Sequence, residues 1–397
     1  MRRLTALVVL VVLAFATLPA SATGPLGLED AEIKRLLQHG PWVDTVPGDP
    51  SNAVSGNPAA IARGHRLFFD PRLSATGTIA CATCHVPERG WADGRPRALG
   101  LAPGDRNTPT ILDVARHRWF SWDGRADSLW SQSLKPIIDP REMGASAEHV
   151  LKLLRGDAGL ACLHAKAFGA PPGGEPERAL VQASKATAAF LETMRSGRTP
   201  FDDFRDALAR GDVAAAARYP VAARRGAQLF VKSQCSVCHF GPAFTNGEFH
   251  DVGVPNALGQ GRVDAGRSDG IKKLRADPFN LLGPWSDDRT GTAAVKTRHV
   301  EATHASFGQF KTPSLRNLAH TAPYMHDGRY ATLREAVRHY SDLDMERIHT
   351  HGEQLLRPLK LSPSEIDDLV AFLESLTDPV AARAPIAPAG VEGCPAS

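Results

Sequence analysis

Two pentapeptides dominate the interpretation of this chain: Cys81-Ala82-Thr83-Cys84-His85 and Cys235-Ser236-Val237-Cys238-His239. Cys-x-x-Cys-His is the attachment sequence of c-type haem. On one helical turn the two thiols reach the two haem vinyl groups, and the histidine that follows ligates the iron. A zinc site or a redox dithiol is the alternative for such cysteine pairs. Because a histidine follows both pairs, we predict two covalently bound haems with His85 and His239 as proximal iron ligands.

The flanks of the two pentapeptides repeat as well. Gly64 and Gly226 each open a G-x-x-L-F segment that leads to the cysteines. Further on, a set of residues recurs at an offset of 204: Thr108-Pro109, Asp123-Gly124-Arg125 and Leu129 return as Thr312-Pro313, Asp327-Gly328-Arg329 and Leu333. Such repetition indicates duplicated domains. The second copy has about fifty extra residues, and the segment 241–310 that holds them is expected to be either a partner surface or a solvated loop.

Helical periodicity covers much of the chain, whereas the period-two pattern of strands is scarce. The helices that it predicts are 28–38, 147–155, 179–194, 221–231, 332–340 and 363–376. Segments rich in Gly and Pro, above all 41–58, 87–109 and 241–313, are expected to be long loops. We therefore predict an all-α protein of two duplicated cytochrome c-like domains, each with one haem and long irregular loops. The expected divisions are a signal peptide at 1–22, a first haem domain at 23–212, a second at 213–380 and a flexible tail at 381–397.

The first residues are typical of a secretory signal peptide. Arg2 and Arg3 precede the apolar run LTALVVLVVLAFATL, which closes on Ala20-Ser21-Ala22. A membrane anchor is the alternative, but the run is shorter than the ~20 apolar residues that a spanning helix needs. We predict cleavage after Ala22, export to a periplasm and no membrane span.

Composition excludes some functions and leaves one question open. The chain has 397 residues, and 46 Lys and Arg against 43 Asp and Glu give a net charge of +3, so we expect no nucleic-acid partner. Four of the six cysteines lie in the pentapeptides. Cys162 and Cys394 either pair or stay free, and the sequence does not decide between the two.

The repeat also aligns the residues expected above the two irons. The offset of 204 pairs Pro136 with Tyr340. Proline has no side-chain donor atom, so we expect the iron of haem 1 to be open. Tyr340 is expected to bind the iron of haem 2 through its phenolate oxygen. Met345 and Met325 are the alternative ligands, and a tyrosine that merely packs on a helix is the other alternative.

Two polar side chains near Pro136 suit the handling of peroxide. Gln132 and Glu142 lie in the segment LWSQSLKPIIDPREM, residues 129–143. A carboxylate there can move a proton from the inner to the outer peroxide oxygen, and an amide can hold peroxide by hydrogen bonding. On their own, a Gln and a Glu are more often surface residues.

Taken together, these features resemble those of the bacterial di-haem cytochrome c peroxidases, and within them those of the MauG-like branch. The resemblance covers about residues 58–378. Its motifs are FFDPRLSATGTIACATCH, GDRNTPT, WDGRADSLWSQSLKPIIDPREM, GAQLFVKSQCSVCHFGPAFTN and FKTPSLRNLAHTAPYMHDGRYATLREAVRHY. It implies that Gln132 and Glu142 are the distal pair that handles peroxide at haem 1, with Pro136 beside them.

The resemblance also implies an electron relay and a metal site. Trp122 would relay electrons between the haems, although a core aromatic is the alternative. The side chain of Asn107 and the carbonyl oxygens of Thr321 and Pro323 would bind a calcium ion, which prefers oxygen donors.

Two departures from the typical family set this chain apart. The loop that usually carries a histidine over haem 1 contains Ala98-Leu99-Gly100-Leu101 here. Tyr340 stands where the typical family has methionine, as in MauG-like proteins. Both departures imply an enzyme that reacts with peroxide in its oxidised form without reductive activation.

The sequence thus predicts a periplasmic di-haem peroxidase. Hydrogen peroxide would react at haem 1, and a protein electron donor would deliver electrons through haem 2. That donor is a small cytochrome c or a cupredoxin in a detoxifying enzyme, or a protein substrate whose side chains are oxidised in a MauG-like one. A non-catalytic electron carrier or haem sensor is the alternative from another class.

Overall fold

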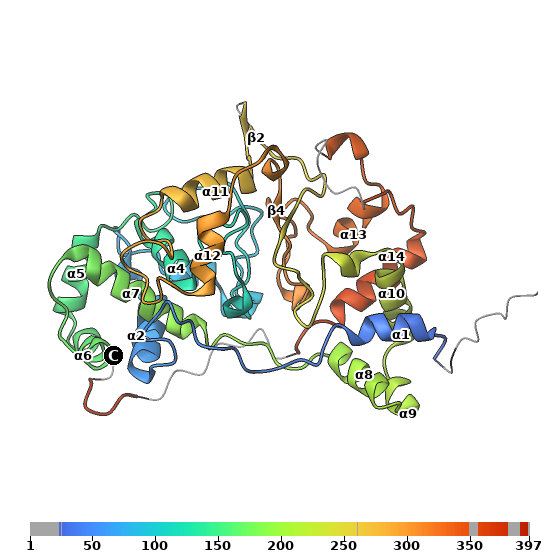
Figure 1. The fold of residues 1–397 in the computed structure, drawn as a ribbon, viewed down its shortest axis with the longest axis horizontal. Coiled ribbons are helices and arrows are strands. Elements are labelled where there is room, and N and C mark those ends of the chain that lie inside the picture. Colours follow the sequence, from blue (N-terminus) through green and yellow to red (C-terminus); the bar gives the residue numbers. More distant parts are fainter. Residues whose placement is uncertain (1–23, 25, 260, 349–355, 380–389, 396–397) are drawn as a thin grey trace, which may run out of the picture.

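The computed structural model describes residues 24, 26–259, 261–348, 356–379 and 390–395. The predicted signal peptide, residues 1–22, lies outside them, as do residues 381–389 of the expected tail. Helices dominate and the strands are few and short (Figure 1). Within the described ranges, every helix is too short or too polar to cross a membrane.

The helices and strands run as follows. The α-helices of the described residues are α1 (Asp30–Leu37), α2 (Pro58–Phe69), α3 (Cys81–Cys84), α4 (Leu129–Ile138), α5 (Ala147–Gly156), α6 (Ala158–Phe168), α7 (Pro176–Leu191), α8 (Pro200–Ala209), α9 (Val213–Ala216), α10 (Val221–Lys232), α11 (Arg267–Ala276), α12 (Thr292–His299), α13 (Leu333–Ser341) and α14 (Pro363–Glu374). The strands are β1 (Phe249–His250), β2 (Ala257–Gly259), β3 (Arg262–Val263) and β4 (Phe310–Lys311). They form two antiparallel pairs, β1 with β4 and β2 with β3.

Each predicted helix is present, as α1, α5, α7, α10, α13 and α14. The expectation of a long loop over 241–313 is wrong, because this segment contains α11 and α12 and all of the short strands. Helix α11 buries only two apolar side chains, those of Ile271 and Leu274. Two residues are too few to produce an apolar stripe that a periodicity search can detect.

One core lies between α2, α4, α5, α6 and α7. Helices α2 and α7 approach closely at Gly64, where a Cβ atom would lie 2.0 Å from the carbonyl oxygen of Ala186. Only glycine allows this approach. Leu67, Trp130 and Phe190 are fully or almost fully buried in the same cluster.

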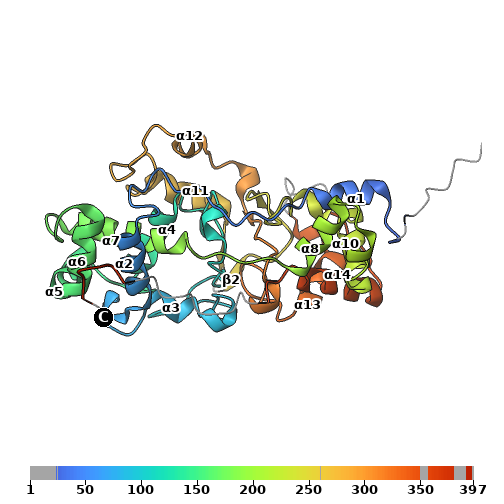
Figure 2. The same ribbon diagram turned by 90° about the horizontal axis from the view of Figure 1, so that it is seen from below.

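A second core lies between α10 and α14. Helix α10 approaches α14 at Gly226, where a Cβ atom would lie 1.9 Å from the carbonyl oxygen of Asp368. Leu36, just at the end of α1, and Phe204 of α8 belong to this cluster too, and both helices lie at the same end of the molecule as α10 (Figures 1 and 2). Helices α1 and α8 therefore pack with the second core, although the boundary expected from the sequence, at residue 212, assigns them to the first domain.

Local backbone geometry also matches across the offset of 204. Isolated bridges pair Phe120 with Ala126 and Tyr324 with Tyr330. Left-handed residues recur in the same register: Asp113, Ser121 and Gly124 in the first stretch, and Asn317, Met325 and Gly328 in the second. The repeated residues thus adopt repeated conformations.

The extra residues of the second copy pack on the first. The carboxylate of Asp127, directly before α4, accepts hydrogen bonds from the backbone of Leu281 and the hydroxyl of Thr297. Lys135 of α4 pairs with Asp277. The segment 249–310 therefore supports the helix that carries Gln132 and Pro136.

The two remaining cysteines are paired. Cys162 on α6 and Cys394 form a disulfide, which answers the question that the sequence left open. Residues 390–395 of the expected tail thus lie beside α6 (Figure 1), where the side chain of Lys166 also donates to the carbonyl of Glu392.

Candidate active site

The first pentapeptide forms one helical turn, α3, followed by His85. The Nδ1 atom of His85 lies 3.0 Å from the carbonyl oxygen of Trp91. A carbonyl only accepts, so Nδ1 carries the proton and Nε2 keeps its lone pair for a metal. Trp91 is 1% exposed and has a φ of 63°, a left-handed conformation that is unusual for a bulky residue.

The second pentapeptide repeats this arrangement. The Nδ1 atom of His239 lies 3.0 Å from the carbonyl oxygen of Phe244, which is fully buried and has a φ of 52°. Sequence reasoning missed both Trp91 and Phe244. A contact made by a backbone carbonyl leaves no signature in the residue type, and only the spacing of five or six residues after each histidine could have indicated it.

The pentapeptide cysteines take no part in the disulfide, which joins Cys162 and Cys394. Burial raises the pKa of Cys81 to about 12, of Cys84 to about 11 and of Cys235 to about 12. A redox dithiol depends on a lowered thiol pKa, so these values argue against that alternative. Among the described residues, no three His, Cys, Asp or Glu side chains are grouped to hold a metal ion, which a zinc site would require.

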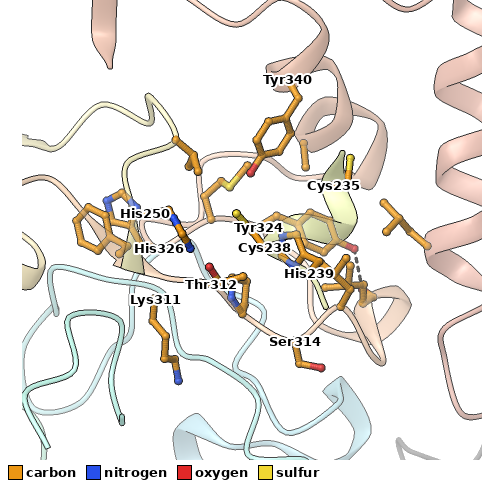
Figure 3. A pocket seen from close by; sticks show the side chains of 18 of the residues that line it. Cys235, Cys238, His239, His250, Lys311, Thr312, Ser314, Tyr324, His326 and Tyr340 are labelled. Carbon is orange, nitrogen blue, oxygen red and sulfur yellow. Dashed lines mark hydrogen bonds between the residues drawn. The ribbon is translucent and has the colours of Figure 1, made fainter. Parts of the chain in front are cut away.

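A cavity of about 460 Å³ adjoins the second pentapeptide (Figure 3). Cys235, Cys238, His239 and Tyr340 line it, and we call this group the second site. Tyr340 comes from α13, and its hydroxyl points inward, toward the side on which Cys238 and His239 lie (Figure 3). Neutral thiols, an imidazole with a free Nε2 and a largely apolar wall fit a covalently attached haem.

Burial raises the pKa of the Tyr340 phenol above its usual range, and the nearby thiols of Cys235 and Cys238 add to the shift. Tyr340 is therefore neutral in the protein alone. Since a buried phenolate needs a compensating charge, Tyr340 would ionise only against a cation such as Fe(III).

The two methionines that the sequence offered as alternative ligands differ in position. Met325 lines the cavity and remains a candidate, whereas Met345 is 39% exposed. The Tyr324 hydroxyl donates to the carbonyl of Leu318.

Sequence reasoning missed two histidines of the cavity wall, His250 and His326. The ring of His326 stacks on Phe310, with 3.5 Å between centroids. His250 Nε2 lies 3.1 Å from the side-chain nitrogen of Asn246. His250 ends the short strand β1 and has no motif around it. His326 precedes the repeated Asp327-Gly328-Arg329 and is the counterpart of Trp122 at the offset of 204, a signal by which the sequence could have indicated it.

The turn that carries Glu142 packs on the loop 99–101, and the carbonyl oxygen of Leu99 in this loop accepts from Cys84 Sγ at 3.8 Å. The backbone carbonyl of Glu142 accepts from Leu101 N–H at 3.0 Å, and a Cβ atom on Gly100 would lie 2.6 Å from the Cα of Glu142. The glutamate as a whole is exposed. Partial desolvation of its carboxyl nevertheless raises the pKa of Glu142, and the charge of Asp139 adds to this shift.

Gln132 and Pro136 are four residues apart on α4 and share one face of the helix. The side-chain oxygen of Gln132 accepts from the Ser121 hydroxyl at 2.8 Å, so its NH₂ group remains to donate. The carbonyl of Pro136 accepts from Met143 N–H at 3.1 Å, which ties the turn that carries Glu142 to α4. We call Gln132, Pro136 and Glu142, together with the first pentapeptide, the first site.

Trp122 lies between the two sites. Its Nε1 donates to the carbonyl of Asn107 at 2.9 Å, and its own carbonyl accepts from Lys311 N–H at 2.8 Å. The ring lines the cavity of the second site, while the preceding residue, Ser121, binds Gln132 of the first.

The residues predicted to bind calcium all line the same cavity: Asn107, Thr321 and Pro323. The side-chain nitrogen of Asn107 donates to the carbonyl of Arg95 at 2.8 Å. Its side-chain oxygen is thereby the atom left for a cation, and the calcium site stays a prediction.

Comparisons of the sequence with family models and with curated proteins point to one family. The family model described as di-haem cytochrome c peroxidase matches residues 58–210. The methylamine utilization protein MauG of Methylorubrum extorquens is 35% identical over 381 residues, which cover 94% of this chain and 94% of that protein. The cytochrome-c peroxidase IdrP2 of a Pseudomonas species is 32% identical over 352 residues, or 87% of this chain and 88% of that one.

The solved structures include a similar fold. The diheme peroxidase BthA from Burkholderia thailandensis has a TM-score of 0.65 and 26% sequence identity, over 88% of this chain and 94% of that one.

Proposed function

The chain belongs to the di-haem cytochrome c peroxidase family, whose members are oxidoreductases, and on that premise we propose how its two sites divide the work. Two duplicated cytochrome c-like domains, 23–212 and 213–380, each hold one covalently attached haem. Cys81 and Cys84 attach haem 1 and Cys235 and Cys238 attach haem 2. His85 and His239 are the proximal ligands.

When bound, haem supplies an iron that exchanges electrons, and the residues of the chain control protons and access. Pro136 has no side-chain donor atom and would leave room for hydrogen peroxide beside a haem held by Cys81, Cys84 and His85. The NH₂ group of Gln132 would donate to the peroxide, while Glu142 would accept the proton of one peroxide oxygen and return it to the other. The O–O bond breaks, and two electrons and two protons complete the conversion of one peroxide to two waters.

Tyr340 would hold the iron of haem 2, and Trp122 would connect the two sites. The bound haems would supply electron exchange, and Trp122 would serve as the relay for electrons donated by a docked protein. Asn107, Thr321 and Pro323 bind a calcium ion between the halves. Two hydrogen bonds support this arrangement: the ring Nε1 of Trp122 donates to the carbonyl of Asn107 in the first half, and the backbone carbonyl of Trp122 accepts from Lys311 N–H in the second.

The observation that supports the proposal is the link between α4 and the turn of Glu142: the carbonyl of Pro136 accepts from Met143 N–H, and the carbonyl of Glu142 accepts from Leu101 N–H in the loop after the first cysteine pair. A plain electron carrier or sensor has no use for this arrangement. The protein is exported to the periplasm by the segment 1–22.

Within this function, we favour a MauG-like enzyme that oxidises side chains of a partner protein, because Tyr340 and Leu101 depart from the typical family. The second candidate is removal of peroxide at the expense of a small cytochrome c or a cupredoxin. The relatives carry both kinds of name, MauG and cytochrome-c peroxidase. Peroxide-dependent oxidation of each reduced carrier, compared with that of a partner protein encoded by a neighbouring gene, separates the two.

The decisive experiment adds stoichiometric peroxide to the purified diferric protein and follows its absorption spectrum. The wild type should consume peroxide and change its spectrum without prior reduction. Glu142→Gln should slow this by about 10²-fold or more, the usual contribution of a positioned acid–base group. Glu148→Gln, an exposed glutamate on α5, is the matched control. A wild type that leaves peroxide untouched, or a Glu142→Gln variant of unchanged rate, would refute the proposal.

A further inference from the structure

We propose that His39, from the segment after α1, is a positioning residue for the proximal ligand of haem 2. The inference rests on the proposed attachment of haem 2 at His239. His39 is 1% exposed, and it lies in the second core although it precedes the first pentapeptide by more than forty residues. The mechanism described above makes no use of it.

The first link between His39 and His239 is a hydrogen bond. His39 Nδ1 lies 3.3 Å from the carbonyl oxygen of Gly241. Because that oxygen can only accept, Nδ1 carries the proton. Burial lowers the pKa of His39 to about 4, so the ring is neutral at physiological pH. The same Gly241 oxygen accepts from Phe244 N–H at 3.0 Å, and His39 therefore completes the turn 241–244.

The second link is a ring contact. The His39 ring stacks on Phe244, with 4.5 Å between centroids and 11° between planes. Phe244 is the residue whose carbonyl accepts from His239 Nδ1, and its φ of 52° is strained for a phenylalanine. His39 thus holds the strained residue from two directions.

This support bears on the iron because the hydrogen bond at Nδ1 sets how strongly an imidazole donates to a metal through Nε2. If Phe244 relaxes toward negative φ, its carbonyl turns away and the donation weakens. His39 therefore tunes haem 2 without touching it.

The arrangement is not repeated at the first site. Trp91, the counterpart of Phe244, packs on Phe68 in a tilted geometry with 6.1 Å between centroids. His39 belongs to the segment that precedes Gly64, where the sequence repeat begins. An element outside the repeat thus contributes to the difference between the two haems.

Three variants of the haem-loaded protein test the inference by low-spin electron paramagnetic resonance and by redox titration of each haem. His39→Leu removes both links and should shift the g values and the potential of haem 2 while those of haem 1 stay unchanged. His39→Phe keeps the ring contact and His39→Gln keeps a donor for Gly241, so each should restore part of the wild-type signal. His65→Phe is the control, since His65 contacts Phe69 and Phe190 in the other core.

If His39→Leu does not accumulate with two haems, His39→Phe and His39→Gln still decide the matter, because each lacks one link. Wild-type signals in all variants that fold, or equal shifts at both haems, would overturn the inference. A wild type that carries two haems but leaves peroxide untouched refutes the peroxidase function alone, because the spectral effect of His39 remains measurable.

Discussion

His85 and His239, the proposed proximal ligands, each depend on a strained neighbour. Trp91 and Phe244 are bulky residues in the left-handed region, where a conformation of this kind costs about 1–3 kcal/mol. Each is buried and each presents its carbonyl to the Nδ1 atom of the histidine. The surrounding core offsets the cost, and the result is a fixed orientation of His85 and His239. Orientation of the metal ligands is thus built into two backbone positions.

Glu142 should give peroxide turnover a characteristic acid limb. The carboxyl can accept a proton only when it is ionised, that is, above its pKa. Because burial raises this pKa, activity should begin to fall at a higher pH than the ~4.3 of an ordinary glutamate. The rate of peroxide consumption measured between pH 4 and pH 8 tests this.

The acid limb should vanish in Glu142→Gln, whose low residual rate should not depend on pH in this range, and persist in Glu148→Gln. An identical limb in wild type and Glu142→Gln would assign the titration to another group.

Tyr340 can be tested against a neighbour of the same type. Tyr340→Phe removes the only oxygen that this side chain could offer to iron, so the low-spin spectrum of haem 2 should change. Tyr324→Phe is a matched control, because Tyr324 lines the same cavity but its hydroxyl is bound to Leu318. If the low-spin spectrum of haem 2 is unchanged in Tyr340→Phe but changes in Met325→Leu, the ligand is Met325 and not Tyr340.

At the scale of helices, close pairing in each core depends on one glycine. Gly64→Ala would place a Cβ atom 2.0 Å from the Ala186 carbonyl oxygen, so α2 and α7 would have to separate. Overpacking typically costs 1–3 kcal/mol, more than the roughly 1 kcal/mol that alanine gains over glycine in a helix. The free energy of unfolding, measured by denaturant titration, should therefore fall.

Gly156→Ala is the control for this substitution. Gly156 ends α5, and a Cβ atom there has nothing within 4 Å. The Gly156→Ala control should keep or slightly raise the free energy of unfolding. A Gly64→Ala variant as stable as the wild type would show that the close approach of α2 and α7 does not depend on glycine at this position.

The sequence revealed most where residue type carries the information. Pentapeptides and the offset of 204 predicted the paired sites, and amphipathic stripes predicted α7 and α14. Helix α11 was not predicted because its buried side includes Arg267 and Gly270. Neither residue contributes to the apolar periodicity by which an amphipathic helix is recognised. Arg267 is buried because it donates to the carbonyl of Gly124 and packs on Phe249. The partners that decide such a burial are distant in sequence.

Across the whole molecule, three segments cross from one half to the other. Helix α1 precedes the first half but packs in the second core. The segment 249–310 belongs to the second half but supports α4. The tail leaves the second half and ends at α6 through the disulfide. These three crossings make the halves mutually dependent, as the proposed relay through Trp122 between two haems would require.

The disulfide should stabilise the molecule as a whole, because the ring from Cys162 to Cys394 has a sequence separation of 232 residues and encloses α10 and α14 of the second core. Closure of long loops restricts the unfolded chain most, and loss of such a bond typically costs about 2–5 kcal/mol. Cys394→Ser should lower the free energy of unfolding by this amount, and Cys162→Ser should match it. The double variant should be no less stable than either single one, because both remove the same bond.

Dithiothreitol should bring the wild type to the same value, since thioether links to haem resist thiol reagents. Unequal single variants would mean that Cys162 or Cys394 contributes through packing, and an unchanged stability would mean that the tail does not restrain the halves.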